Sequence, residues 1–395
     1  MNSSTSTPLP IPKPDTRKII VLGLLQILSW GGSFYLLGVL ADPIAASTGW
    51  SHQAVLAGAS IGLLVAGLLA PWCGRLIARL GGRRVLAGHG FFLAAGLGLL
   101  AVAPSLPLYW LGWVIIGVAM AAGLYDALFT SLGATYGLGA RPVIVGVTLI
   151  SGFCTTVIWP LLAFMVHTLG WRLTCGVYAI VALVTLYPLY RYALPAPPPR
   201  VANARSTTGN SHAVPPTIYW AMTVLFAIAA ALMTCLSLVL ITVLQARGHS
   251  LASAIALGAL IGPAQVLCRV VDLVAKRQAP LTTALLSSGF TALGLLLVDF
   301  APAAVALGLV AYGAGNGLRA IVKSTLPLLV VQPEDYAVVA GRMARPALIA
   351  QALAPVACGY LLAHWGAEAM IDLMVMLALI AFGLSLWLAR LISTR

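Results

Sequence analysis

The chain has 395 residues, of which 61% are hydrophobic and only 8% are charged, and its mean hydropathy is +1.01. This composition leaves too little polar surface to cover a soluble globule of that length, which excludes a water-soluble protein. The formal net charge of +13 does not indicate nucleic-acid binding, because no soluble segment carries a patch of basic and aromatic residues. The composition therefore predicts a protein embedded in a lipid bilayer.

Twelve stretches of about 20 apolar residues follow one another along the chain. A helix of about 20 residues crosses a hydrocarbon core of about 30 Å, and it satisfies its backbone amides internally. The pattern predicts an all-α membrane protein with 12 transmembrane helices at residues 19–40, 54–73, 85–104, 107–130, 142–168, 173–193, 217–244, 252–275, 282–299, 302–325, 343–363 and 371–391. The tenth and eleventh stretches are the least regular, because four basic residues interrupt them.

The Lys and Arg residues between these stretches gather on alternate loops. If the N-terminus is cytoplasmic, the tails and loops of that side hold fifteen of these residues, and the opposite side holds only Arg172 and Arg247. Such an excess marks the cytoplasmic side of a membrane protein and favours contact with anionic lipid head groups. We expect a multi-pass protein of the bacterial inner membrane, with cytoplasmic tails at residues 1–18 and 392–395.

One long polar segment, residues 195–216, interrupts the apolar pattern. It begins with four prolines among five residues and continues with a run rich in Ser, Thr and Asn, so it cannot bury a core and is predicted to be a cytoplasmic linker. The linker separates a six-helix bundle at 19–194 from a second one at 217–391. Two parallel six-helix repeats around a central path are typical of secondary transporters.

A motif of glycines and arginines connects the second and third predicted helices. Residues 74–84, GRLIARLGGRR, resemble the signature loop of the major facilitator superfamily, G-x-L-x-D-R-x-G-R-R. The resemblance implies the major facilitator fold and a cytoplasmic gate in which glycines permit close helix approach and charges pair across the interface. The residues that match these gate positions are Gly74, Arg79, Gly81, Arg83 and Arg84. Ala78 replaces the family's acidic residue, which leaves the charge pairing open, and the alternative is a positively charged loop with turn glycines.

Within this superfamily the chain looks most similar to bacterial relatives of the monocarboxylate and oxalate/formate porters. The resemblance rests on Gly49-Trp50-Ser51, Tyr125-Asp126, Gly170-Trp171-Arg172, Arg269 and the segment 313–317, GAGNG. Drug export is less favoured, because Trp159-Pro160 stands where the Gly-rich run of drug/proton antiporters would lie. The resemblance implies a small organic anion as substrate.

Arg269 lies near the middle of the eighth predicted helix, where a charge costs at least about 2.5–3.5 kcal/mol to insert and is usually kept for function or pairing. A guanidinium can bind a carboxylate through two parallel hydrogen bonds. The resemblance to monocarboxylate and oxalate porters implies that Arg269 binds the substrate anion, and a purely structural ion pair is the alternative. Asp272, three residues later on nearly the same face, is expected to pair with Arg269 or to take part in proton coupling.

Other ionisable residues fall inside predicted helices. Asp126, in the fourth helix, is predicted to carry a proton or to form a gate or interhelix ion pair. Arg319 and Asn316 share one face of the tenth helix and are predicted to contact substrate. Lys323 and Arg345 are expected to serve the cytoplasmic gate or to reach lipid head groups.

Three aromatic residues are candidates for substrate contact, although most intramembrane aromatic residues only pack. Trp30 and Tyr35 flank a Gly-Gly-Ser segment in the first helix that would let this helix bend, and Trp159 lies in the fifth helix.

The sequence therefore predicts a secondary active transporter that moves a small organic anion by alternating access. A monocarboxylate is one candidate substrate, moved as a symporter with protons or in exchange for another anion. We expect a monomer that uses no metal or cofactor and binds no nucleic acid. A proton-coupled exporter of amphipathic compounds is the first alternative. A membrane enzyme or a transporter-like receptor is less favoured, since the six histidines form no metal-ligand pair and no nucleophile elbow or phosphate loop occurs.

Overall fold

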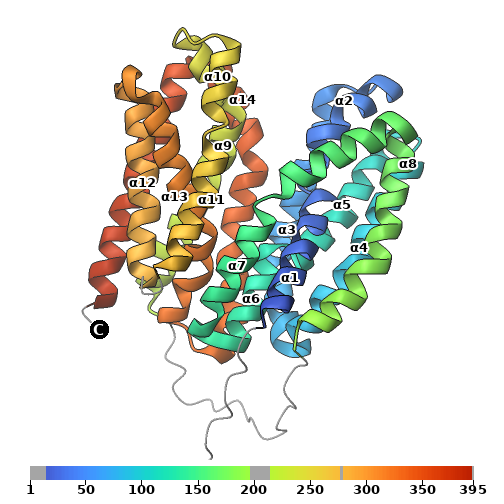
Figure 1. Ribbon diagram of the computed structural model, residues 1–395, viewed down its shortest axis with the longest axis horizontal. Helices are drawn as coiled ribbons and strands as arrows, with labels where there is room; N and C mark the ends of the chain where they lie inside the picture. Colours follow the sequence, from blue (N-terminus) through green and yellow to red (C-terminus); the bar gives the residue numbers. More distant parts are fainter. Residues whose placement is uncertain (1–14, 196–213, 276–278, 394–395) are drawn as a thin grey trace, which may run out of the picture.

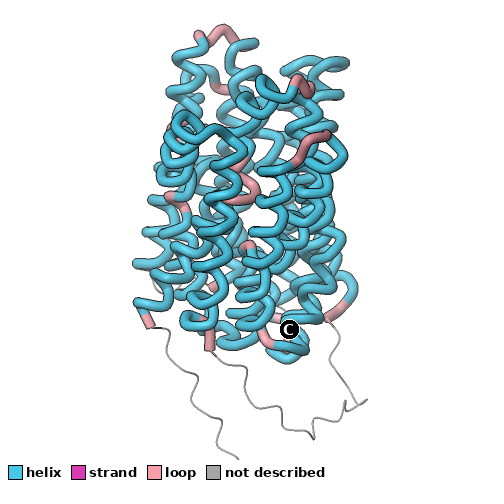
Figure 2. Tube along the Cα trace, turned by 90° about the vertical axis from the view of Figure 1, so that its right-hand side faces the viewer, coloured by secondary structure: helices cyan, strands magenta, loops and turns pink. Residues whose placement is uncertain are grey.

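A computed structural model describes residues 15–195, 214–275 and 279–393. Most of the expected linker at 195–216, the greater part of the tail at 1–18 and the last two residues lie outside the described residues. The described residues form helices joined by short turns, without any strand. Figure 2 shows the helices extending along one common direction, with loops at the two ends of the molecule and at several places between them.

The N-terminal half forms one bundle, drawn from blue to green in Figure 1. Its helices are α1 Thr16–Gly31, α2 Leu37–Thr48, α3 His52–Leu80, α4 Gly82–Val102, α5 Leu106–Gly123, α6 Tyr125–Tyr136, α7 Arg141–Ser151 and α8 Cys154–Ala193. A short 3₁₀ turn, Gly137–Ala140, precedes α7. The core of this bundle buries large side chains such as Trp113, Tyr109 and Tyr190.

The C-terminal half forms the second bundle, drawn from yellow to red in Figure 1. Its helices are α9 Pro216–Ala246, α10 Leu251–Gly258, α11 Ile261–Val274, α12 Pro280–Phe300, α13 Val305–Thr325 and α14 Pro333–Ser393. Short 3₁₀ turns, Pro302–Ala304 and Pro327–Leu329, flank α13. Two apolar clusters of this half pack around α9, α12 and α14.

Eight helical stretches of the described residues are long and apolar enough to cross a membrane. The longest are Leu106–Ala193, with 88 residues, and Pro333–Ser393, with 61 residues. Since one crossing takes about 20 residues, each of these two has room for more than one. The expected spans all fall mainly on helical residues, which supports the all-helical membrane fold predicted from the sequence.

The structure differs from the expected spans in where helices break. Four expected spans are interrupted, at residues 32–36 between α1 and α2, at Leu124, at 152–153 and at 259–260. Breaks of this kind free backbone carbonyls and are tolerated in membrane proteins where protein groups satisfy them. They are common in the helices that line the binding sites of secondary transporters.

Two loops expected between spans are instead sharp kinks within one helical run. Gly170 in α8 has φ +76° and Gly366 in α14 has φ +79°. Only glycine adopts this region without steric strain, so each glycine reverses the chain direction without a separate loop. The helix of the eleventh span also begins at Pro333, ten residues earlier than expected, with Glu334 and Asp335 in its first turn.

The two bundles contact each other near the end of the molecule where α1 begins and α14 ends, which we call the terminal end (Figure 1). The helix α3 changes partners along its length. Near its start, Gly58 lies against Trp113 of its own bundle, whereas Gly67 lies against Leu348 and Gly74 against Ala337, both of α14. The terminal end is therefore where the two halves are packed together in this conformation.

At the opposite end, an arginine ties three helices of the second bundle together. Arg247, which follows α9, donates to the Glu368 carboxylate at 2.8 Å and to the Val298 carbonyl, and it forms an ion pair with Asp299. Glu368 lies just beyond the kink of α14, and Asp299 lies in the last turn of α12. The cluster thus holds the ends of α9 and α12 against the kink of α14.

The Arg247 cluster predicts a pH dependence of stability. The hydrogen bond from Arg247 lowers the pKa of Glu368 below its ordinary value of about 4.3. A carboxyl group whose pKa is lower in the folded state stabilises the fold at pH values above its ordinary pKa. This stabilisation is lost as the pH falls through the folded-state pKa. We expect Glu368→Gln to melt at a slightly lower temperature than the wild type at about pH 7, and at the same temperature near about pH 3. Thermal unfolding in detergent measures this, and an equal difference at both pH values would contradict it.

Candidate functional site

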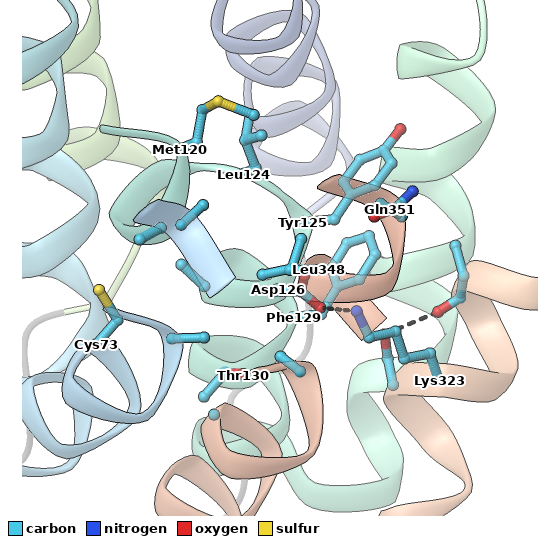
Figure 3. Close-up of a pocket in the computed structure, with 18 of the residues that line it drawn as sticks. Cys73, Met120, Leu124, Tyr125, Asp126, Phe129, Thr130, Lys323, Leu348 and Gln351 are labelled. Atoms are coloured by element: carbon cyan, nitrogen blue, oxygen red, sulfur yellow. Dashed lines mark hydrogen bonds and ion pairs between the residues drawn. The ribbon is translucent and has the colours of Figure 1, made fainter. Parts of the chain in front are cut away.

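A cavity with about 860 Å³ of space, part of it open to solvent, lies between the two bundles. Both halves contribute to its lining (Figure 3). Its apolar lining includes Trp30, Phe34, Leu63, Met120, Phe129, Met233 and Leu348, and its polar lining includes Tyr125, Asp126, Arg319, Lys323 and Gln351. The lining is thus largely aromatic and apolar, with charged groups of both signs.

The break between α5 and α6 positions Asp126 at the cavity. Leu124 adopts an extended conformation, and α6 restarts at Tyr125, so Asp126 lies in the first turn of the new helix. The free N–H groups of this turn favour a negative charge there. The Asp126 carboxylate pairs with the Lys323 ammonium of α13 at 2.5 Å (Figure 3).

This contact joins the two halves of the protein across the cavity. Lys323 was expected at the gate or at lipid head groups, and the structure places it on the cavity wall, paired with an acid of the other half. Of the two expectations for Asp126, the present conformation has the ion pair. Neither side chain is fully buried, since 29% of the Asp126 side chain and 18% of the Lys323 side chain are exposed.

Arg319 is the cation that lines the cavity without a carboxylate partner among the described residues. Its Nε donates to the Asn316 side-chain oxygen at 3.0 Å, and one terminal nitrogen contacts the Met233 sulfur at 2.6 Å. A guanidinium has five N–H donors, so most of them stay available to an acceptor in the cavity. Arg319 therefore lies on the wall of the central cavity, and its contact with a substrate stays a prediction.

Arg269 does not line this cavity, contrary to what its midspan position suggested. The side chain is 8% exposed, and it donates to the Gly317 carbonyl of α13 at 3.0 Å and to the Thr148 carbonyl of α7 at 2.9 Å. These two carbonyls belong to different halves of the protein. Arg269 therefore connects the halves in this conformation, and its cost of burial is offset by backbone acceptors rather than by an acid.

Asp272 pairs with Arg141, and the expected pair with Arg269 does not form. The Arg141 guanidinium at the start of α7 donates to Asp272 at 2.8 Å and to the Thr283 hydroxyl at 2.9 Å. Asp272 and Arg269 share one region of α11, but their side chains reach different neighbours. The second carboxylate oxygen of Asp272 is buried without a partner among the described residues.

Of the three aromatic candidates, Trp30 alone lines the central cavity. Its ring packs against Tyr125 with centroids 5.0 Å apart, and its indole N–H donates to Gln26 at 3.0 Å. Gln26 also donates to the Gly123 carbonyl at 2.8 Å, at the break that precedes α6. Gln26 therefore fixes Trp30 and the break at Gly123 relative to each other.

Tyr35 and Trp159 form no part of the lining of the central cavity. The Tyr35 ring contacts Trp30 at 5.8 Å and Trp159 at 6.4 Å between centroids, and the Trp159 indole donates to the Tyr35 carbonyl at 3.3 Å. Trp159 is 42% exposed. A contact of Tyr35 or Trp159 with substrate therefore stays a prediction.

The motif at 74–84 lies at the terminal end, where the halves meet. A Cβ added to Gly74 would lie 2.3 Å from the Ala337 carbonyl oxygen, and one added to Gly341 would lie 2.7 Å from the Ala70 carbonyl oxygen. Two glycines on facing helices therefore permit a close crossing of α3 and α14, as the motif implies. Gly81, with φ +82°, makes the turn into α4.

The arginines of the motif form no ion pair with any residue that the structure describes. Arg79 and Arg84 are exposed, and the Nε of Arg83 is buried without a partner among the described residues. The absence of the acidic residue at Ala78 accounts for the missing local partner. In the part of the chain that the structure describes, ion pairs between the halves are instead Asp126–Lys323 and Arg141–Asp272.

Sequence reasoning missed several residues of the site. Gln351, in the apolar run of α14, lines the cavity and is 8% exposed. A buried amide in an apolar span is a signal that could have identified it. Met233 has no such signal, because a methionine in an apolar helix is ordinary, and Arg141 was grouped with the loop cations although it reaches the buried Asp272.

Two helical bundles, with a mixed polar and apolar cavity between them and close packing at one end, are the architecture of membrane carriers that alternate between two openings. Residues 22–344 match the Major Facilitator Superfamily, and the chain belongs to this family. The protein is therefore a transporter of the secondary carrier type and not an enzyme. No curated protein matches the chain in sequence.

Several solved structures are similar to this chain. The human organic anion transporter MFSD10 is 16% identical, with a TM-score of 0.70 over 94% of this chain and 100% of that chain. The proton:xylose symporter XylE is 14% identical, with a TM-score of 0.71 over 95% and 96%. FucP in the outward conformation is 14% identical, with a TM-score of 0.73 over 94% and 98%. At these identities the similarity shows the fold alone.

Proposed function

We propose that this transporter carries a small organic anion and that Arg319 binds the anion. The observation that carries the proposal is a guanidinium at the central cavity that keeps free N–H donors and has no carboxylate partner among the described residues. Keeping such a charge inside a membrane protein is costly, and a carboxylate on the guanidinium offsets this cost through charge-assisted hydrogen bonds. A monocarboxylate, as in the porters that the sequence resembles, is the simplest such substrate.

We assign the coupling step to the Asp126–Lys323 pair. Protonation of Asp126 would weaken a contact that joins the two halves, and an arriving anion would compete for Lys323 on the same cavity wall. Both events favour opening of the terminal end. The pair thus offers a route to proton symport, and exchange of one anion for another needs only the competition for Lys323.

The charge pattern of the loops supports a cytoplasmic terminal end, with both tails inside and a bacterial inner membrane as the location. In this orientation the structure has its cytoplasmic side packed together. Gly74 and Gly341 then act at the cytoplasmic gate, and Gly81 sets its turn. We propose a monomer, since each half finds its packing partner within the same chain.

An exporter of amphipathic compounds is the second candidate, and one observation favours it. The cavity wall is rich in aromatic and methionine side chains, including Trp30, Phe129 and Met233, which suit apolar or cationic ligands. A cationic compound would have to overcome Arg319 and Lys323 on the same wall. The Arg319 guanidinium, which has no carboxylate partner among the described residues, therefore favours the anion.

Uptake by proteoliposomes separates the two candidates. We expect labelled lactate, pyruvate or another small carboxylate to accumulate, and accumulation to rise when the exterior is made more acidic if a proton accompanies it. Liposomes without protein serve as the control. Extrusion of amphipathic cations without movement of any carboxylate would replace the anion proposal by the exporter.

A further inference from the structure

A second pocket lies inside the C-terminal bundle and shares Arg319 with the central cavity. It has about 500 Å³ of space, part of it open to solvent, and it lies among α9, α12, α13 and α14. Its apolar wall includes Leu225, Phe226 and Ala381. An anion bound by Arg319 therefore lies where the central cavity meets the second pocket. Another part of the same substrate molecule can enter this pocket.

The pocket presents hydrogen-bond acceptors from α12. The hydroxyls of Ser287, Ser288 and Thr291 line it, and each donates its own proton to a backbone carbonyl, at 2.7 to 2.8 Å. A hydroxyl that has donated its proton still has lone pairs and can only accept. This side of the pocket thus suits a group that donates.

The facing helix α13 presents two further polar groups. Tyr312, Asn316 and Arg319 are spaced by four and three residues, so they share one face of α13, and all three line the pocket. Asn316 accepts from Arg319 with its oxygen, and its amide N–H groups have no acceptor among the described residues. The Tyr312 side chain is 3% exposed, and its hydroxyl forms no hydrogen bond with any described residue. Tyr312 and Asn316 therefore keep hydrogen-bonding capacity that a ligand in this pocket can use.

We propose that this pocket binds the hydroxyl group of the substrate, and that the transporter prefers carboxylates that carry a hydroxyl near the carboxylate. The Asn316 amide adjoins the guanidinium that holds the carboxylate, so it can donate to a hydroxyl on the next carbon or the one beyond. That hydroxyl in turn donates to an α12 acceptor or to Tyr312. The inference rests on the proposed binding of the anion by Arg319, and it adds the second recognition element.

The test compares matched acids that differ by one hydroxyl, butyrate and 3-hydroxybutyrate, together with acetate and glycolate. Proteoliposome uptake gives kcat/KM for each acid. We expect the wild type to favour the hydroxylated acid of at least one pair. Tyr312→Phe removes one hydroxyl that has no partner among the described residues, and it should lower this preference by about 3- to 10-fold.

Thr291→Val removes a hydroxyl acceptor and keeps a side chain of similar shape. It should lower the same preference. Tyr360→Phe, at an exposed tyrosine of α14, is the matched control and should keep the wild-type preference. Arg319→Gln should lower uptake of both acids of a pair. Equal uptake of the two acids by the wild type, or an unchanged preference in folded Tyr312→Phe and Thr291→Val, would overturn the hydroxyl pocket and leave the anion proposal standing. Failure of Arg319→Gln to change uptake of either acid would overturn the anion proposal itself.

Discussion

Uptake of a carboxylate should fall by about 100-fold or more when Arg319 is replaced by glutamine. Glutamine keeps a polar side chain, although a shorter one, and removes the charge that the anion would neutralise. Arg319→Lys should recover only part of the activity, because an ammonium cannot form the two parallel hydrogen bonds of a guanidinium. Initial rates in proteoliposomes, with protein incorporation measured for each variant, give the comparison.

The control for this prediction is Arg345→Gln, because Arg345 is exposed on α14 and lies outside both pockets. This variant should transport at the wild-type rate. Arg319→Gln at the wild-type rate, with a folded protein, would remove Arg319 from the binding site. A loss of similar size in Arg345→Gln would show that positive charge in general, rather than this guanidinium, supports uptake.

Replacing Gly74 by alanine should shift the protein away from the conformation described here. The added Cβ would lie 2.3 Å from the Ala337 backbone oxygen, a contact that only separation of α3 from α14 can relieve. Overpacking of this kind costs about 1–3 kcal/mol, which moves a two-state equilibrium by roughly 5- to 150-fold. Transport should fall, because a carrier that seldom closes its terminal end cannot complete the cycle.

Cys73, which lines the cavity next to Gly74, is a native reporter of this change. In inside-out vesicles, a membrane-impermeant maleimide should label Cys73 faster in Gly74→Ala than in the wild type, as read by mass spectrometry of the Cys73 peptide. Gly98→Ala is the matched control, because a Cβ at Gly98 would meet no atom within 4 Å. Equal labelling in all three proteins would show that the crossing of α3 and α14 does not control access.

The sequence predicted the helical membrane fold because hydrophobic stretches of spanning length carry that information directly. It also predicted the close helix approach at Gly74, because the family motif that residues 74–84 resemble has a glycine at this position. The structure shows that Gly74 lies against Ala337 and Gly341 of α14. The helix breaks were harder to predict. The breaks at Leu124 and at 259–260 lie in apolar runs where no proline or polar residue stands at the break itself.

The site could be predicted only in part, because sequence shows which charges are buried and not where their side chains point. Arg269 and Arg319 both occupy predicted spans, and their polar neighbours, Asp272 and Asn316, do not show which guanidinium faces the cavity. The structure turns Arg269 toward two backbone carbonyls and Arg319 toward the cavity. Asp272 likewise pairs with Arg141, a residue 131 positions away, and not with Arg269 on the same helix. Such pairings depend on the packing of the two halves, which no local pattern encodes.

The most direct test of the account is equilibrium binding of a labelled carboxylate to the purified protein, measured for the wild type, Arg319→Gln and Arg345→Gln. The account predicts saturable binding by the wild type and Arg345→Gln, and its loss in Arg319→Gln. Binding of equal affinity by Arg319→Gln would contradict it, because the guanidinium at the central cavity would then have no part in holding the anion.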